Sequence, residues 1–231
     1  MTIAGGNHID GDTRPRRAPL YGHPSMDVLT ERALRLAETG RALLGIVGEP
    51  GAGKSTFAEQ LLARVEHERP GLAVTVSMDG FHLAQKVIEA RGQTGRKGTI
   101  ETFDPDGFLA TLRRTRADAG GTVWWPEFNR GLEDAVAGSI AVAAHHRLVI
   151  VDGNFLLSTQ GSWERVKSVL DEAWFLDARP ESRRERLTRR YISYGFTPQA
   201  ARAKALGVDE STSALIRSTV SRADLVLSEL G

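Results

Sequence analysis

Residues 48–56, GEPGAGKST, are the feature of this chain that most constrains its fold. They follow a short apolar run, residues 42–47, and precede a stretch with apolar residues at helical spacing, residues 57–65. The segment matches G-x-x-x-x-G-K-[ST], the pattern of a loop that joins a buried strand to a helix and cradles phosphate groups. The sequence therefore predicts a strand, a phosphate-binding loop and a helix, in that order.

Each residue type in this loop suits a nucleotide with Mg²⁺. Glycines let backbone N–H groups converge on phosphate oxygens, and the N-terminus of the following helix favours an anion. Lys54 can reach the β- and γ-phosphates, the Ser55 hydroxyl can ligate Mg²⁺, and Thr56 lines the α-phosphate side. The loop predicts a bound nucleotide with Mg²⁺ without fixing which nucleotide, and the predicted nucleotide-binding residues are Gly48, Gly51, Ala52, Gly53, Lys54, Ser55 and Thr56.

Four further apolar runs lie near helical patterns, and such runs are typical of strands covered on both faces. They are residues 73–77, 148–151, 173–176 and 223–227. The fold class is therefore α/β with a parallel sheet, and 231 residues suit one domain. The polar residues 1–24 are expected to be a flexible tail, and residues 25–231 the folded domain.

Composition excludes several kinds of site. The chain has no cysteine, which excludes disulfides and thiolate-bound metals, so oxygen atoms must hold any metal ion. The 30 basic and 29 acidic residues nearly cancel, which argues against nucleic acid and membrane partners. No signal peptide or membrane-spanning run is visible, so a cytoplasmic protein is expected.

Two carboxylates follow directly after predicted strands. Asp79 comes after residues 73–77, and Asp152 ends the run 148–151. Ligands of open α/β sheets gather at the carboxyl ends of the strands. Asp79 is then a candidate base for an acceptor hydroxyl, and the predicted Mg²⁺ ligands are Ser55, Asp152 and Asp79. The alternatives are a turn aspartate and a structural one.

An arginine-rich helix is predicted over residues 179–190. Helical spacing places Arg183, Arg186 and Arg190 on one side, where their planar forks could close on phosphate oxygens as a lid. Arg186 and Arg190 are the first choices for stabilising the charge on the transferring group. The alternative is a solvated helix face whose glutamates pair locally.

Residues 124–130, WWPEFNR, bring an aromatic ring, a carboxylate, an amide and a guanidinium together. Such a group suits a polyol or a ring as substrate, although each tryptophan alone is typical of a core. The candidate substrate contacts from this segment are Glu127, Phe128, Asn129 and Arg130.

The segments SMDGFHL, RKGTIETFDPDGF, WWPEFNR, VIVDGNFLL and RERLTRR follow the loop in this order. With it they resemble the phosphoribulokinase/uridine kinase family of P-loop kinases over residues 43–227. The second segment and its surroundings look like bacterial pantothenate kinase, and the chain as a whole is similar to the fructokinase-like kinases of bacterial sugar-uptake operons. The resemblance implies a three-layer sandwich with a five-stranded parallel sheet, in the order 2-3-1-4-5, and a helical lid.

The resemblance also implies roles for single residues. It makes Asp79 the catalytic carboxylate and Asp152 an acidic residue that helps to place Mg²⁺. Its matching segments offer further substrate contacts at His82, Arg96, Lys97, Glu101 and Asn154. Uridine kinase-like proteins carry a tyrosine and an aspartate after the proline, whereas this chain has Phe128 and Asn129, which argues against uridine.

The function predicted from the sequence is an ATP- and Mg²⁺-dependent kinase. It would transfer the γ-phosphoryl group to a hydroxyl of a small molecule, a sugar or sugar-like compound, with Asp79 as base and Lys54, Arg186 and Arg190 stabilising charge. Alternatives are a nucleoside (uridine-type) or pantothenate kinase and, from another class, a regulatory P-loop NTPase acting on a protein partner. The oligomeric state stays open, with a homodimer as one option.

Overall fold

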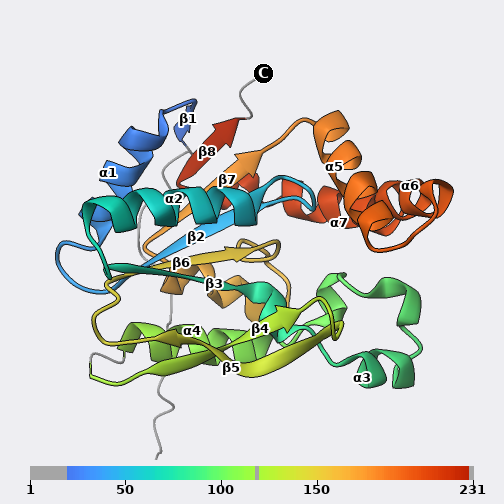
Figure 1. Cartoon of the computed structure of the whole chain (residues 1–231), viewed down its shortest axis with the longest axis horizontal. Coiled ribbons are helices and arrows are strands. Elements are labelled where there is room, and N and C mark those ends of the chain that lie inside the picture. The colour runs from blue at the N-terminus through green and yellow to red at the C-terminus, as the bar shows by residue number, and fades with distance from the viewer. Residues whose placement is uncertain (1–19, 118–119, 229–231) are drawn as a thin grey trace, which may run out of the picture.

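The computed structural model describes residues 20–117 and 120–228 of the chain. In these residues a six-stranded parallel sheet has the order β1-β8-β7-β2-β6-β3 (Figure 1). Its strands are β1 (Leu20–Gly22), β2 (Ala42–Gly48), β3 (Ala73–Ser77), β6 (Leu148–Gly153), β7 (Glu172–Asp177) and β8 (Leu225–Ser228). The α/β class predicted from the sequence is confirmed.

The strand order 2-3-1-4-5 is also confirmed, as β3-β6-β2-β7-β8. The sixth strand, β1, was not predicted. It pairs with β8 from Leu20↔Leu225 to Gly22↔Leu227 and lies inside the segment expected to be a tail. Three residues are too few to show a strand pattern, so the expectation of a tail is corrected for residues 20–22; residues 1–19 of the expected tail lie outside the described part.

Two apolar cores cover the faces of the sheet. Every residue of β2 and of β6 is buried. On one face α1 (Met26–Leu36) and α2 (Lys54–Glu68) contribute Leu29, Leu61 and Val65, and on the other α4 (Pro105–Ala117) contributes Phe108 and Leu112. Burial on both faces explains why these strands read as continuous apolar runs.

An antiparallel hairpin of β4 (Val123–Asn129) and β5 (Asp134–Val142) contains the segment WWPEFNR. Trp125 is buried, and its Nε1 donates a hydrogen bond to Thr115 Oγ1 (2.9 Å), whereas Trp124 is exposed. The interpretation of each tryptophan as a core residue is therefore right for Trp125 and wrong for Trp124.

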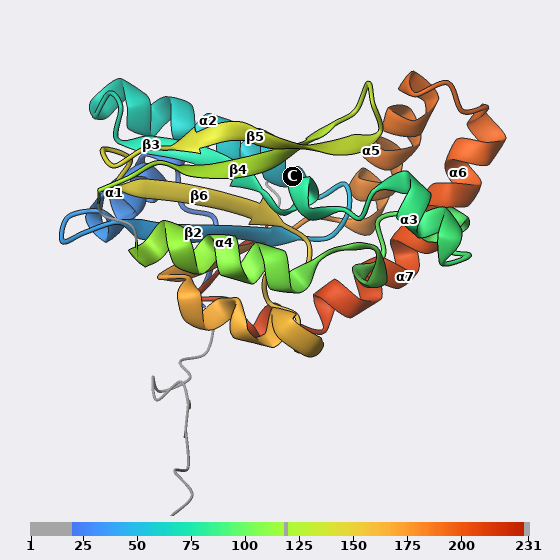
Figure 2. The same ribbon diagram turned by 90° about the horizontal axis from the view of Figure 1, so that it is seen from below.

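Helices gather beyond the ends of the strands, at the right of Figure 1. They are α3 (Gln85–Ala90), α5 (Pro180–Ser193), α6 (Pro198–Leu206) and α7 (Val208–Arg217). Figure 2 shows the hairpin and α4 from below, and Arg130 at the hairpin turn has its Cζ 5.9 Å from the ring centroid of Tyr194, the residue after α5. Short 3-10 turns complete the described fold at Met78–Phe81, Thr94–Arg96, Ile100–Thr102, Gly161–Arg165, Lys167–Val169 and Val220–Arg222. Within the described ranges, no helix is both long and apolar enough to span a bilayer.

Candidate active site

The loop between β2 and α2 needs its glycines. Gly51 and Gly53 have φ angles of +78° and +92°, a region that side chains rarely adopt. A Cβ atom on Gly51 would also lie 2.7 Å from the Arg183 carbonyl oxygen, because α5 packs directly on the loop. The loop therefore has the backbone shape that the sequence pattern predicts.

Lys54 is half-buried at the first turn of α2 and donates a hydrogen bond to the Glu49 carbonyl oxygen (3.2 Å). Burial lowers the pKa of Lys54 to about 8, although the carboxylates of Asp152 and Asp79 act in the opposite direction. A phosphate anion bound next to this ammonium would stabilise its charged form.

Asp152, at the end of β6, lies next to the start of α2. Ser55 Oγ donates a hydrogen bond to Asp152 Oδ2 (2.6 Å). Burial and the nearby Asp79 raise the pKa of Asp152, and its Oδ1 has no hydrogen-bond partner among the described residues. An unpartnered buried carboxylate oxygen beside a hydroxyl fits Mg²⁺, which prefers oxygen ligands. In the described part of the chain no cluster of three or more His, Cys, Asp or Glu side chains is placed to hold a metal ion.

Asp79 lies in the short turn Met78–Phe81 after β3. Its backbone N–H donates to Ser77 Oγ (3.2 Å), and its backbone oxygen accepts from His82 Nδ1 (2.8 Å). Its carboxylate lies 3.7 Å from Arg130 Nη2. The backbone is thus fixed while the carboxylate stays accessible.

One cavity of about 430 Å³ brings most predicted site residues together, although they come from distant segments. The predicted residues that line it are Gly51, Lys54, Ser55, Asp79, His82, Lys97, Phe128, Arg130, Asp152, Asn154 and Arg190. The His82 ring lies between those of Phe103 (3.9 Å between centroids) and Phe128 (4.9 Å), so one wall is aromatic. Burial lowers the pKa of His82.

Four predicted substrate residues do not line this cavity. Arg96 and Glu101 form an exposed ion pair with each other (3.1 Å). Asn129 Oδ1 accepts from the backbone N–H groups of residues 131 and 132 and so closes the hairpin turn. Glu127 is exposed next to Phe128 on β4, and alternating strand residues point to opposite faces. These four residues thus lie outside the cavity and have local partners or surroundings, and their role as substrate contacts stays a prediction.

A second cavity of about 490 Å³ begins at Ala52, Gly53 and Thr56 and is also lined by Arg186. Its remaining lining comes mainly from residues 22–26, 176–178 and 227–228 and from Leu29, Phe57 and Gln60. The predicted loop residues are therefore divided between the two cavities, with Gly48 packed against the backbone of Leu176 instead. Arg186 and Arg190 also face different cavities.

Arg183 has a role that its helical spacing did not indicate. Its side chain is fully buried and forms ion pairs with Glu49 and with Glu210 Oε2 (3.5 Å). Its Nη1 donates to the Pro50 carbonyl oxygen (3.1 Å) and to Ser213 Oγ (2.9 Å). The arginine thus joins α5 and α7 to the phosphate-binding loop, and its place in a row of phosphate-binding arginines is corrected.

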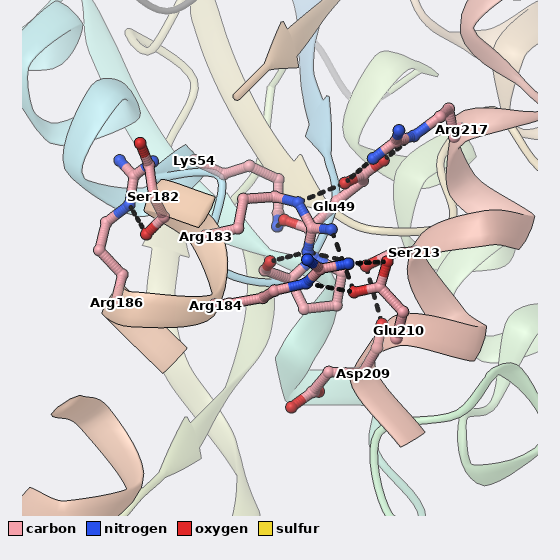
Figure 3. A network of polar contacts seen from close by, with 11 residues as sticks. Glu49, Lys54, Ser182, Arg183, Arg184, Arg186, Asp209, Glu210, Ser213 and Arg217 are labelled. Atoms are coloured by element: carbon pink, nitrogen blue, oxygen red, sulfur yellow. Dashed lines mark hydrogen bonds and ion pairs between the residues drawn. The ribbon is translucent and has the colours of Figure 1, made fainter. Parts of the chain in front are cut away.

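Arg217 completes this network, which Figure 3 shows converging on Glu49. Its guanidinium binds the Glu49 carboxylate at 2.6 and 2.9 Å. Arg186 lies apart, with its Nε donating to the Ser182 carbonyl oxygen (3.1 Å). Glu49 stands at a variable position of the loop pattern, so the sequence offered no signal for this network.

Helices α5, α6 and α7 and the loop after α5 add cavity residues that the sequence did not indicate. Tyr191, Tyr194, Phe196, Lys204 and Asp209 all line the 430 Å³ cavity. The Tyr191 hydroxyl donates to Asp209 Oδ2 (2.7 Å), and burial raises the pKa of Asp209. Only the helical pattern of residues 179–190 pointed to this region, and it ends before all five of these positions.

No protein-family model matches the chain. It is 35% identical over 165 residues to the uncharacterised protein YggC of Escherichia coli strain K12, covering 71% of this chain and 67% of YggC. It is 29% identical over 179 residues to a protein of Schizosaccharomyces pombe assigned as a uridine kinase, covering 74% and 76% of the two chains.

The crystal structure of a protein assigned as a fructose transport system kinase, from Silicibacter sp. TM1040, superposes with a TM-score of 0.80. Its sequence is 32% identical, and the match covers 88% of this chain and 98% of that one. These similarities agree with the phosphate-binding loop and with the strand-end carboxylates. The chain belongs to the P-loop kinases and is a phosphotransferase with a hydroxyl group as acceptor.

Proposed function

We propose that the chain transfers the γ-phosphoryl group of ATP, with Mg²⁺, to a hydroxyl of a small sugar or sugar-like metabolite. The observation that carries this proposal is that Lys54 and Asp79 line the same cavity. A phosphate donor and a base for the acceptor must share one space, because in-line transfer needs the hydroxyl next to the γ-phosphate. Residues 20–228 form the kinase domain in this proposal.

Lys54, Ser55 and Asp152 form the donor side. Lys54 pairs with the β- and γ-phosphates, while Ser55 Oγ and the unpartnered Asp152 Oδ1 hold the metal ion. When bound, Mg²⁺ would neutralise charge on the phosphate oxygens. The nucleoside of ATP occupies the 490 Å³ cavity, because that cavity is largely apolar and starts at Gly53 and Thr56.

Asp79 and the aromatic wall form the acceptor side. The Asp79 carboxylate accepts the hydrogen bond of the acceptor hydroxyl and takes its proton as the oxygen attacks phosphorus. Phe128 and His82 pack against the body of the acceptor, and Asn154 offers an amide. Arg190 lies close enough to Lys54 to lower its pKa, so it can stabilise charge on the transferring group.

Two of the alternatives are a nucleoside kinase and a pantothenate kinase, which share this donor side and differ in the acceptor. A regulatory NTPase that acts on a protein partner is the alternative of another class. It is disfavoured because the cavity extends beyond the phosphate-binding loop to Lys97, Phe128 and Arg130, where a switch protein needs no pocket.

The test is ADP release from the full chain with MgATP and a panel of sugars, sugar phosphates, polyols, nucleosides and pantothenate. One acceptor should stimulate release, and Asp79→Asn should lower that stimulated rate by roughly 10²- to 10⁴-fold while nucleotide still binds. Asp106→Asn, an exposed aspartate paired with Arg165 outside the cavity, is the control and should keep the rate. ADP release that no acceptor stimulates would favour the regulatory NTPase.

A further inference from the structure

Two cations line the acceptor end of the 430 Å³ cavity beyond the phosphate-binding loop, Lys97 and Arg130. They flank the ring of Phe128, with Lys97 Nζ 5.0 Å and Arg130 Cζ 5.7 Å from its centroid. In the proposed reaction Lys54 and Arg190 bind the phosphates of ATP, so Lys97 and Arg130 are not needed there. Their place next to Asp79 makes them candidate contacts for the acceptor.

Lys97 is poorly neutralised for a side chain that is only 16% exposed. Its Nζ donates to the Glu133 carbonyl oxygen (2.5 Å), and the nearest carboxylate among the described residues, that of Glu133, lies 3.8 Å away and is 60% exposed. Lys167, with a similar exposure of 17%, has the Asp224 carboxylate at 2.5 Å. An ammonium has three donors, so Lys97 retains two for a ligand.

Arg130 is more exposed than Lys97, at 50%, and it too lacks a close carboxylate. Its shortest contact with a carboxylate among the described residues is 3.7 Å, to Asp79 Oδ2, and its guanidinium also lies 5.9 Å from the Tyr194 ring centroid. A guanidinium has five donors in a planar fork that matches a carboxylate or a phosphate. Since Asp79 serves the acceptor hydroxyl in the proposed reaction, it cannot be the full partner of Arg130.

The backbone holds this end of the cavity in a fixed shape. Glu133 has a φ of +54°, the only non-glycine residue with a positive φ in the described part of the chain. Glu133 is the last residue of the turn between β4 and β5, where a left-handed backbone conformation is common. Here it directs the Glu133 carbonyl oxygen at Lys97 and holds the ammonium at the cavity wall.

We propose that the acceptor carries an anionic group, a carboxylate or a phosphate, which binds Lys97 and Arg130 while its hydroxyl lies at Asp79. The acceptor is then a hydroxy acid or a sugar phosphate and not a neutral sugar or nucleoside. This inference rests on the proposed function. The hydroxyl oxygen forms a bond to the γ-phosphorus, the bond from that phosphorus to the β–γ bridging oxygen breaks, ADP leaves, and the hydroxyl proton passes to Asp79.

The experiment compares acceptors that differ only in the charged group, with the full chain and MgATP. Suitable pairs are pantothenate and pantothenyl alcohol, glycerate and glycerol, gluconate and glucose, and fructose 6-phosphate and fructose. In the pair that reacts, kcat/KM for ADP release should be roughly 10- to 100-fold higher for the anion, which is the range of one or two charge-assisted hydrogen bonds.

Variants at Lys97 identify the cause of the preference. Lys97→Met should raise KM for the anionic acceptor roughly 10- to 100-fold and bring the anion-to-neutral ratio towards one, without a matching change in KM for ATP. Lys97→Arg should restore part of the preference. Lys86→Met, at an exposed lysine of α3 away from the cavity, is the matched control and should keep the ratio.

The possible failures can be told apart. If neutral members of the pairs react as fast as the anions, the kinase function stands and the anionic acceptor is wrong. If Lys97→Met lowers kcat/KM equally for both members, Lys97 acts on the fold and not on the charge of the acceptor, which also overturns the inference. If no acceptor of either kind stimulates ADP release, the proposed function itself fails.

Discussion

The carboxylate of Glu49, inside the phosphate-binding loop, forms a buried ion pair with Arg183 of α5. Arg217 of α7 binds the same carboxylate from the other side, as Figure 3 shows. The helix that carries Arg186 and Arg190 is therefore anchored to the loop at its first turn. Any movement of α5 that brings Arg190 to the phosphates must start beyond this anchor.

Glu49→Gln should destabilise the fold strongly, because it removes the closer of the two carboxylate partners of the fully buried Arg183 and leaves only Glu210 at 3.5 Å. Breaking a buried pair from one side costs about 3 to 5 kcal/mol of the free energy of unfolding. Urea denaturation should show a lower midpoint with an unchanged slope. The control is Glu185→Gln, which breaks an exposed pair with Arg189 and should change stability by less than about 1 kcal/mol. Equal losses in the two variants would contradict the anchor.

Nucleotide affinity should depend on pH through Lys54. Its pKa is about 8 in the free protein because the ammonium is buried, and bound phosphate would raise it again. Between the free and bound pKa values, binding must take up a proton, so ATP affinity should fall as pH rises above about 8. Calorimetry at pH 8.5 in two buffers with different ionisation enthalpies should detect this uptake. Lys54→Arg should lose the uptake, since arginine stays protonated; an equal uptake in that variant would exclude Lys54 as the group.

The parts of the site that the sequence predicted are local in the chain or follow from the sheet. The loop from Gly48 to Thr56 is one continuous segment, so its sequence pattern alone predicts its backbone shape. Asp79 and Asp152 could be predicted to lie at the same edge of the sheet, because the carboxyl ends of parallel strands meet there. Their meeting with Lys54 in one cavity follows from the same rule.

The remaining features depend on packing between distant segments. Helical spacing placed Arg183 on one side of α5, but only the fold shows that this side packs on Pro50 and Gly51. The β4–β5 hairpin was missed because Pro126 interrupts its pattern where the strand register shifts. Arg96 and Glu101 resembled substrate contacts, yet they pair with each other outside the cavity.

Gly80→Ala tests the contact that holds the hairpin against the turn of Asp79. A Cβ atom on Gly80 would lie 2.2 Å from the Pro126 carbonyl oxygen, so β4 or the turn must move. Overpacking of this kind costs about 1 to 3 kcal/mol, and kcat should fall because Asp79 is the neighbouring residue. Thermal unfolding and the ADP-release assay measure the two effects. Gly95→Ala, where nothing lies within 4 Å of the new methyl group, is the matched control and should stay within about 0.5 kcal/mol. If the two variants had the same stability and the same kcat, β4 would move away from the new methyl group without lowering either.

Arg186 and Arg190 should have separable kinetic effects, although they lie one helical turn apart on α5. Arg190 lines the cavity of Lys54 and Asp79, whereas Arg186 lines the cavity assigned to the nucleoside, and a Cβ atom on Gly53 would lie 3.6 Å from Arg186 Nη1. A positive charge that contacts the transferring phosphoryl group acts mainly in the transition state, so its loss lowers kcat. A positive charge beside the bound nucleotide acts equally in the ground state and the transition state, so its loss raises KM for ATP.

Arg190→Met should therefore lower kcat by about 10²-fold or more with a small change in KM for ATP, in the range seen when one charge-stabilising donor is removed. Arg186→Met should instead raise KM for ATP about 10-fold with kcat nearly kept, and each variant serves as the control for the other. Steady-state ADP release with varied ATP at saturating acceptor separates the two parameters. The same change in both parameters for both variants would mean that the two arginines act on one site, which requires α5 to turn about its axis when nucleotide binds.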